Sequence, residues 1–293
     1  MSVVWRPLPK SSGDPARTSS RGADAPALSV LNRVPLWHDR GAVAQRVDYD
    51  AIAGVYDRRY QQNDFSGIER AVASFVGTEP GAVVVEVGCG TGRWLRLLRA
   101  KGIRATGMDA SSGMLSRAQS PVVQAVAGQL PYASRSIDRV FCVNAFHHFP
   151  DKQAFLAEAR RVLRPGGQLM IVGLDPHAGV DRWYVYDYFP SALETDRRRY
   201  VATSRIREWM QQAGFTGCET REAQHSPTRI DARTALREGR LDRSATSQLN
   251  LLPEEEYRQG IERIRTESDL AVTQGTPLVL TADLRLYATY GSV

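Results

Sequence analysis

The segment EVGCGTGRW, residues 86–94, places an acidic side chain and three glycines directly behind the apolar residues 82–85. Glycine adopts positive φ angles without strain and lets a ligand approach the main chain, so such a turn is typical of a binding site. The spacing Gly88-x-Gly90-x-Gly92 is tighter than the GxGxxG fingerprint of dinucleotide-binding proteins. A second carboxylate, Asp109, lies 21 residues beyond Gly88 at the end of the next apolar run. It can accept hydrogen bonds from two ribose hydroxyls there, so the pattern predicts a ligand that carries a ribose.

The elements around this turn alternate between short apolar runs and amphipathic segments. We expect strands at 82–87, 104–108, 122–126, 139–143 and 168–173, and helices at 92–100, 111–118 and 151–164. Helical patterns at 52–56 and 68–76 precede them, and a helix at 204–213 and strands at 215–222 and 278–290 follow. Apolar strands that alternate with helices predict a parallel sheet covered on both faces, with ligands bound beyond the carboxyl ends of the strands.

Residues 1–47 differ from the rest of the chain in composition. They are rich in Ser, Pro, Ala, Gly and Arg and show no sustained periodicity, so we expect a disordered tail, with a transit peptide as the alternative. This segment holds seven basic and three acidic side chains, which leaves 31 basic and 29 acidic residues in 48–293. The net charge of +6 is therefore concentrated in the tail. The nearly neutral body argues against nucleic acid as a partner.

Two further features bear on the compartment. The sequence has no apolar stretch long enough to cross a membrane and no evident secretory signal, so we expect a cytoplasmic protein with no membrane partner. The three cysteines are widely spaced and form neither a disulfide framework nor a metal pattern, so we expect no metal site.

Four segments together resemble the motifs of class I S-adenosylmethionine-dependent methyltransferases of the type-11 group. VVVEVGCGTGRW resembles the first motif, GMDASSGML the second, DRVFCVNAFHHFPD the fourth-strand region, and EARRVLRPGGQLMIVG the helix and strand that follow. The similarity covers about residues 48–174. It implies an α/β, Rossmann-like doubly wound sheet of seven strands in a domain at 48–293, with S-adenosyl-L-methionine as cofactor and S-adenosyl-L-homocysteine as product. A helical insertion is expected before the last strand.

The resemblance also implies a set of cofactor contacts at the first turn, the second strand end and the N-terminal helix. These residues are Tyr56, Glu86, Gly88, Cys89, Gly90, Asp109, Ala110 and Asn144. Three of them have structural alternatives, because Glu86 can tie down the glycine turn, Asp109 can cap the following helix, and Tyr56 can be an ordinary core aromatic.

His147 and His148 follow the fourth strand at the same edge of the sheet. Methylation of a hydroxyl usually requires removal of a proton, and a histidine that titrates near neutral pH suits a general base. One of the pair, with His148 preferred by position, is therefore the candidate catalytic residue. The alternative is that both rings only hydrogen-bond and shape the pocket. The acceptor atom stays open.

The densest aromatic segment, RWYVYDYFP at 182–190, follows the fifth strand. We expect Trp183, Tyr184, Tyr186, Tyr188 and Phe189 to help enclose an apolar or planar small molecule, with 175–200 and 224–275 as the substrate-side lid. The alternative is that these rings pack a helix against the core.

The sequence thus predicts an enzyme that transfers a methyl group to a small organic molecule, with a place in bacterial secondary metabolism. Two rivals remain, an RNA (tRNA) methyltransferase and a non-catalytic S-adenosylmethionine-binding regulatory protein. The substrate and the oligomeric state are left open.

Overall fold

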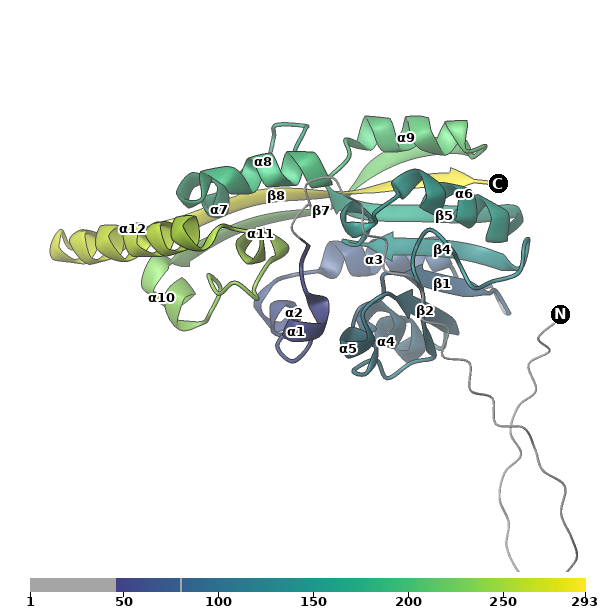
Figure 1. Cartoon of the computed structure of the whole chain (residues 1–293), viewed down its shortest axis with the longest axis horizontal. Coiled ribbons are helices and arrows are strands. Elements are labelled where there is room, and N and C mark those ends of the chain that lie inside the picture. Colours follow the sequence, from purple (N-terminus) through teal and green to yellow (C-terminus); the bar gives the residue numbers. More distant parts are fainter. Residues whose placement is uncertain (1–45, 80) are drawn as a thin grey trace, which may run out of the picture. The chain divides into compact units, whose positions relative to one another are not determined.

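The computed structural model describes residues 46–79 and 81–293, so nearly all of the predicted tail 1–47 lies outside the described residues. The described part contains a central sheet and helices on both of its faces (Figure 1). The strands are β1 (Val84–Val87), β2 (Ala105–Asp109), β3 (Val122–Gln124), β4 (Ile137–Val143), β5 (Leu163–Leu174), β6 (Arg182–Trp183), β7 (Thr216–Asp231) and β8 (Val279–Ser292).

The helices fall into an N-terminal group, a group that covers the sheet, and a group around the far ends of β7 and β8. The first two groups are α1 (Tyr49–Ile52), α2 (Arg58–Gln62), α3 (Ser66–Val76), α4 (Arg93–Ala100), α5 (Ser112–Leu115), the 3-10 helix η1 (Phe146–His148), α6 (Lys152–Val162) and α9 (Thr203–Gln212). The third group is α7 (Tyr184–Tyr188), α8 (Pro190–Arg199), α10 (Ala232–Arg237), α11 (Ser247–Asn250) and α12 (Glu254–Thr273).

The strand order confirms the doubly wound architecture. The sheet runs β3-β2-β1-β4-β5-β8-β6, and β7 pairs with the other side of β8. Strands β1 to β5 are parallel, whereas β8 is antiparallel to β5, β6 and β7. The order reverses between β1 and β4, so the carboxyl ends of these two strands form the crevice in which such sheets bind ligands.

The sheet has one strand more than the predicted seven. Arg182 and Trp183 pair with Asp283 and Ala282 of β8, where β8 extends beyond β5. Strand β7 also runs on to Asp231, so residues 224–231 of the predicted lid are strand rather than insertion. The helical insertion between β7 and β8 is present and starts at α10.

The two faces of the sheet carry separate apolar cores. Val85 of β1 and Cys142 of β4 pack with α6 and α9 on one face, whereas Val84 and Phe141 pack with α3 and α4 on the other. Successive residues of a strand point to opposite faces, so each strand contributes to both cores. This two-sided burial explains why the strands read as continuous apolar runs in the sequence.

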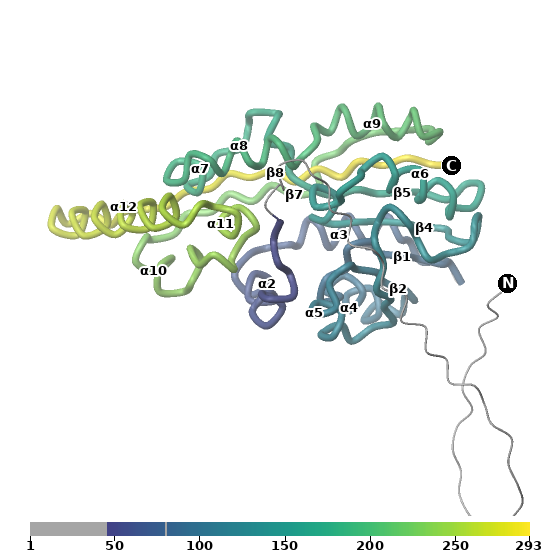
Figure 2. Tube along the Cα trace, in the orientation of Figure 1, coloured from purple at the N-terminus to yellow at the C-terminus, as the bar shows by residue number. Residues whose placement is uncertain are grey.

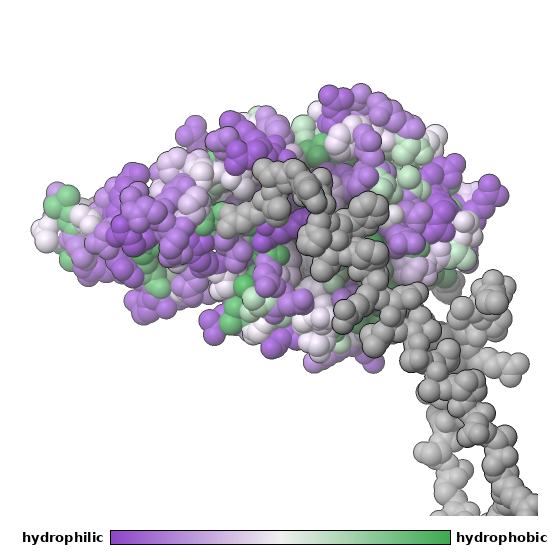
Figure 3. Space-filling view, viewed as in Figure 1, coloured by the Kyte–Doolittle hydropathy of each residue, from purple (hydrophilic) through white to green (hydrophobic). Residues whose placement is uncertain are grey.

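A third core lies around the far ends of β7 and β8. Trp183, Phe189, Leu249, Ile264 and Leu280 belong to it, together with other side chains of α7, α8 and the insertion. Figure 2 shows α10, α11 and α12 beside these strand ends. The face of α12 turned outward in Figure 3 is largely hydrophilic, as expected of a helix that buries only one side.

Helix α1 docks onto the start of α5 through one carboxylate. Asp50 Oδ1 accepts hydrogen bonds from Ser111 Oγ and from the Gly113 amide, both at 2.6 Å. These bonds hold the pKa of the exposed Asp50 carboxyl below its usual value. The N-terminal helices are thereby placed beside the second strand and its following helix.

Two features of the described residues bear on membranes and metals. In residues 46–79 and 81–293, no helix combines the length and apolar character needed to cross a bilayer. The same residues contain no group of His, Cys, Asp and Glu side chains placed to hold a metal ion.

Candidate active site

The glycine turn connects β1 to α4 and has the conformation that the sequence predicts. Gly88 has φ +74°, and its amide donates to the Met108 carbonyl at 2.8 Å. A Cβ on Gly88 would come within 2.4 Å of the Ala145 Cβ, so only glycine fits between β1 and the segment after β4. Gly90 has φ +53°, and a Cβ there would meet nothing closer than Tyr56 Cε1 at 3.9 Å. The backbone at Gly90 therefore lies open toward Tyr56.

Cys89 differs from its glycine neighbours because its side chain points inward. The thiol is buried and packs toward Gly107 of β2, and burial raises the thiol pKa. The side chain of Cys89 is therefore withdrawn from the surface of the turn. The predicted cofactor contact of Cys89 is thus limited to backbone atoms.

Asp109 ends β2 and binds the backbone on both sides of the crevice. Its Oδ2 accepts from the Gly90 amide at 2.8 Å and its Oδ1 accepts from the Ser111 amide at 2.9 Å. The cap of α5 is Ser111, whose hydroxyl accepts from the Met114 amide, so Asp109 is not the capping residue. Burial raises the pKa of Asp109. Each carboxylate oxygen keeps a further lone pair, which leaves capacity for ribose hydroxyls.

Glu86 lies beneath the glycine turn and is 1% exposed. Its Oε2 is buried and has no hydrogen-bond partner among the described residues. Burial, and then the charge of Asp109, raise the pKa of Glu86 well above its usual value. A buried carboxylate oxygen without a donor is costly, so this side chain is suited to a donor supplied by a ligand.

Two more predicted cofactor residues lie beside the turn. Tyr56 is half-buried, and the guanidinium carbon of Arg59 lies 4.2 Å from its ring centroid. Tyr56 is thus part of an aromatic cluster at the crevice and not of the sheet cores. Ala110 follows Asp109, and its carbonyl accepts from Gln124 Nε2 at 3.0 Å.

Asn144 follows β4 in the left-handed region, with φ +51°. Its amide donates to the Val172 carbonyl of β5 at 2.8 Å. A non-glycine residue in this conformation is uncommon, and such strain clusters at functional sites. Asn144 also lines the cavity described below, so it lies where the crevice and the cavity meet.

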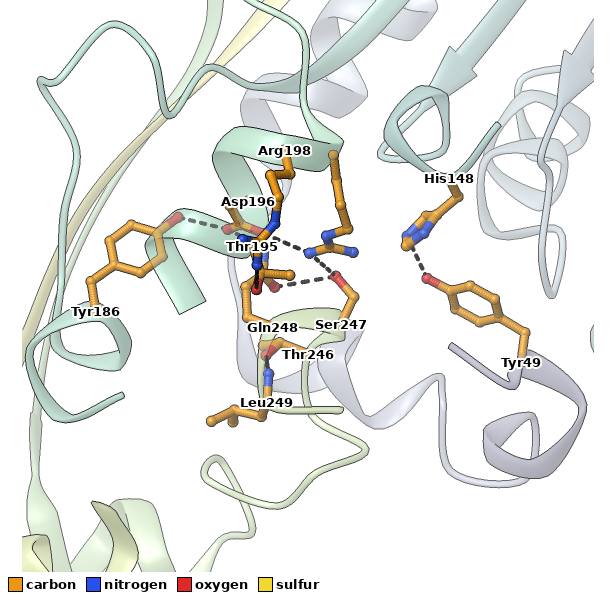
Figure 4. A network of polar contacts seen from close by, with 11 residues as sticks. Tyr49, His148, Tyr186, Thr195, Asp196, Arg198, Thr246, Ser247, Gln248 and Leu249 are labelled. Carbon is orange, nitrogen blue, oxygen red and sulfur yellow. Dashed lines mark hydrogen bonds and ion pairs between the residues drawn. The ribbon is translucent and has the colours of Figure 1, made fainter. Parts of the chain in front are cut away.

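Of the histidine pair, His147 is buried and His148 is half-buried. His147 stacks on Tyr200 with ring centroids 3.9 Å apart, and the Tyr49 hydroxyl lies 2.6 Å from His148 Nε2 (Figure 4). Burial, and then the charges of Arg199 and Arg59, lower the pKa of His148 to about 3. Burial also lowers the pKa of His147 and raises that of Tyr49. In the tautomer that carries its proton on Nδ1, a neutral His148 accepts the hydrogen bond that Tyr49 donates.

A cavity of about 210 Å³ opens beside this pair. One wall comes from Tyr49, Arg59, Asn144, His147 and His148, and the opposite wall from α11 and the extended parts of β7 and β8. Trp183 and Tyr184 of the aromatic segment line it. The cavity thus joins the edge of the sheet to the insertion.

The other three predicted aromatic residues lie away from the cavity. Tyr186 and Tyr188 are not among the residues that line the cavity, and Phe189 is fully buried in the third core. The Tyr186 hydroxyl donates to Asp196 at 2.8 Å, and the Tyr188 hydroxyl donates to Glu267 at 2.5 Å. These rings fasten α7 to α8 and α12, because the segment folds into a helix rather than an open loop.

Several cavity residues were missed by sequence reasoning. They are Tyr49, Arg59, Tyr200, Arg240 and Gln248. For Tyr49 a signal existed, since it precedes Tyr56 by one heptad in the same segment. For Gln248 there was none, because its position depends on a long-range bond to the buried Asp196 at 2.8 Å.

Comparison with known proteins agrees with this architecture. The family model described as "Methyltransferase domain" matches residues 85–171. A demethylmenaquinone methyltransferase from Tropheryma whipplei is 31% identical over 144 residues, which span 46% of this chain and 60% of that protein. An uncharacterized methyltransferase from Synechocystis is 30% identical over 144 residues, which span 47% of this chain and 68% of that protein.

Among solved structures, a putative methyltransferase from an antibiotic biosynthesis pathway of Anabaena variabilis has the same fold. Its TM-score is 0.58 at 20% identity, over 76% of this chain and 96% of that chain. Together with the family match, the strand order and the glycine turn, these findings define a class I methyltransferase. The chain belongs to the S-adenosylmethionine-dependent methyltransferase family. The chain spans less than two thirds of the length of the Tropheryma relative.

The residues present fit the cofactor of this family, S-adenosylmethionine. The open backbone at Gly90, the spare lone pairs of Asp109 and the unpartnered Glu86 oxygen lie at the carboxyl ends of β1 and β2. Gly90 offers room for close approach of the cofactor, and Asp109 offers acceptors for its ribose hydroxyls. Glu86 offers a partner for its ammonium group.

Proposed function

We propose that this protein transfers a methyl group from S-adenosylmethionine to a small organic molecule held in the cavity. The observation that carries the proposal is the position of the cavity, next to the glycine turn and closed by the insertion. Gly90 lies against Tyr56, Tyr56 against Tyr49, and Tyr49 bonds to His148 in the cavity wall. This continuous series of contacts makes the cofactor crevice and the cavity neighbours, as a direct transfer requires.

In this proposal the crevice residues hold the cofactor. Glu86 would pair with the amino group of the methionyl part, Gly88 and Gly90 would let that part approach the backbone, and Asp109 would accept from the ribose. The cofactor supplies an electrophilic methyl group on a sulfonium. Cys89 and Ala110 would contribute main-chain atoms, and Asn144 and Tyr56 would close the side toward the acceptor.

Tyr49 and His148 would handle the proton of a hydroxyl acceptor. The acceptor hydroxyl would pass its proton to Tyr49 Oη as Tyr49 passes its own to His148 Nε2. His148 starts neutral, so it can receive a proton, but its low pKa makes it a weak base. The pair therefore suits an acceptor that is itself acidic, and His147 would position His148 by packing between it and Tyr200.

The size and lining of the cavity support a small acceptor. About 210 Å³ is smaller than most small-molecule sites, which run from about 300 Å³ upward, and aromatic and aliphatic side chains make up much of the wall. The Tropheryma relative is named for demethylmenaquinone, which is an organic molecule and not a nucleic acid. The place in secondary metabolism stays a prediction.

The test is a titration followed by a transfer assay on the full chain. Calorimetry should show that S-adenosylmethionine and S-adenosylhomocysteine bind in the micromolar range, and release of S-adenosylhomocysteine should then depend on a member of a small-acceptor library. Transfer to bulk tRNA, with binding that weakens steeply as salt rises, would instead establish the RNA alternative. Cofactor binding without transfer to any acceptor would favour the regulatory alternative.

A matched pair of variants tests the proton path. Tyr49→Phe removes the hydroxyl and keeps the ring, so kcat for a hydroxyl acceptor should fall about ten-fold or more while S-adenosylhomocysteine affinity is kept. Tyr184→Phe removes another cavity hydroxyl and serves as the control. Equal kcat for both variants would mean that Tyr49 and His148 only shape the cavity.

A further inference from the structure

Arg59 of α2 is the least compensated cation in the cavity wall. Its Nη2 donates to the Ala245 carbonyl at 2.8 Å, and its guanidinium lies over the Tyr56 ring. Its Nε is buried without a hydrogen-bond partner, and no carboxylate within residues 46–79 and 81–293 pairs with it. A guanidinium withdrawn from water without an anion is unfavourable, so this one is suited to an anion from a ligand.

The other arginines near the cavity have carboxylate partners. Arg240 pairs with Glu238 at 2.9 Å, and Arg199 pairs with the fully buried Asp196 at 2.6 Å. The one carboxylate among the cavity-lining residues is Asp64, which is exposed and accepts from the amide and hydroxyl of Ser66. The cavity therefore carries an excess of positive charge that centres on Arg59.

The remaining walls define the shape of the ligand. Aromatic rings of Tyr49, Phe65, Trp183, Tyr184 and Tyr200 line the cavity. A cavity of about 150 Å³ accommodates benzene, so about 210 Å³ has room for one or two fused rings with a small substituent. Flat aromatic surfaces pack well against planar ligands.

We infer that the acceptor is a one- or two-ring aromatic carboxylate whose carboxylate pairs with Arg59. The planar guanidinium matches a planar carboxylate, and the aromatic walls hold the ring system. This inference rests on the proposed function, because it names the substrate class of the same cavity.

The experiment compares acids with neutral amides of the same shape. Benzoate and benzamide, and 2-naphthoate and 2-naphthamide, are titrated into the full chain saturated with S-adenosylhomocysteine, with binding followed by tryptophan fluorescence and calorimetry. At least one acid should bind about ten-fold or more tightly than its amide, as expected for a charge-assisted pair. Equal binding of acid and amide, or no binding of any of the four at about 10 mM, would overturn the inference.

Two variants locate the preference at Arg59. Arg59→Met keeps an unbranched stem over Tyr56 and should abolish the preference for the acid, whereas Arg59→Lys should retain part of it. Arg58→Met changes the exposed neighbour on the same helix and should leave the preference intact. A preference that survives in Arg59→Met overturns the assignment. If Arg59→Met does not fold, the wild-type acid and amide comparison still decides.

Failure of this inference and failure of the proposed function give different results. S-adenosylhomocysteine that binds normally, with no discrimination between acid and amide, refutes the aromatic carboxylate alone. Absence of S-adenosylhomocysteine binding refutes the proposed function itself.

Discussion

Replacing Glu86 by glutamine is expected to stabilise the free protein and weaken cofactor binding at once. The side chain is 1% exposed, and its Oε2 has no partner within the described part of the chain. Because the pKa of Glu86 is raised, the folded state holds its proton more tightly than the unfolded state does. The ionised group therefore costs stability as the pH rises above about 4.5. An unsatisfied buried group of this kind costs about 1 to 3 kcal/mol.

Glutamine keeps the shape and removes the charge, so Glu86→Gln should raise the melting temperature near pH 8. The gain should be about 2 to 4 °C per kcal/mol for a chain of this size, and it should shrink near about pH 3.5, where Glu86 is largely protonated in both states. S-adenosylmethionine would lose a charged partner for its amino group, worth about 1.5 to 3 kcal/mol, so affinity should fall about ten-fold or more.

Thermal unfolding at the two pH values and calorimetry with S-adenosylhomocysteine measure both effects. Glu208→Gln is the control, because Glu208 is an exposed carboxylate paired with Arg205 at 2.7 Å, and it should change neither quantity. A lower melting temperature for Glu86→Gln together with unchanged affinity would refute the reasoning. Glu86 would then serve to tie down the glycine turn, as the structural alternative holds.

Three shorter predictions concern neighbouring residues. Asp109→Ala should reduce cofactor affinity about ten-fold or more in calorimetry, because ribose acceptors and the bond to the Gly90 amide are lost together; unchanged affinity would remove the assignment. Gly88→Ala should lower the melting temperature more than Gly81→Ala, since both have positive φ but only the first Cβ would clash, at 2.4 Å from Ala145. His148, with its pKa lowered to about 3, should destabilise the fold as pH falls below about 6.5, by about 2 kcal/mol near pH 5. Urea unfolding at about pH 7 and pH 5 should therefore show a smaller pH dependence in His148→Asn, and an equal dependence would contradict the shift.

The cofactor half of the fold could be predicted because its information is local. Each strand from β1 to β5 is an apolar run, and the glycine turn is a continuous segment between β1 and α4. The positive φ of Gly88 follows from the residue type and its place between a strand and a helix. Even here the sequence could not show that Ser111, rather than Asp109, caps α5, since Asp and Ser are both favourable capping residues and lie only two positions apart.

The acceptor cavity could not be predicted in the same way, because its wall is assembled from distant segments. Arg59 meets Ala245 across 186 positions, and Tyr49 meets His148 across 99. The aromatic segment after β5 shows the same limit. Its residue types favour one shared role for all the rings, but Trp183 and Tyr184 line the cavity, whereas the Tyr186 and Tyr188 hydroxyls bond to Asp196 of α8 and Glu267 of α12.

The cofactor part and the acceptor cavity differ in this way because they rest on different apolar cores. The cofactor edge rests on the two cores of the sheet, whereas the far wall of the cavity rests on the third core, around the extended ends of β7 and β8. Substitutions in the third core can therefore reshape the acceptor cavity without moving Gly88 or Asp109. Arg59 contacts both parts of the site. Its guanidinium stacks on Tyr56 beside the glycine turn and also donates to the Ala245 carbonyl in the insertion. An anion that pairs with Arg59 would thus stabilise the contact between the cofactor edge and the far wall of the cavity, at the point where methyl transfer has to occur.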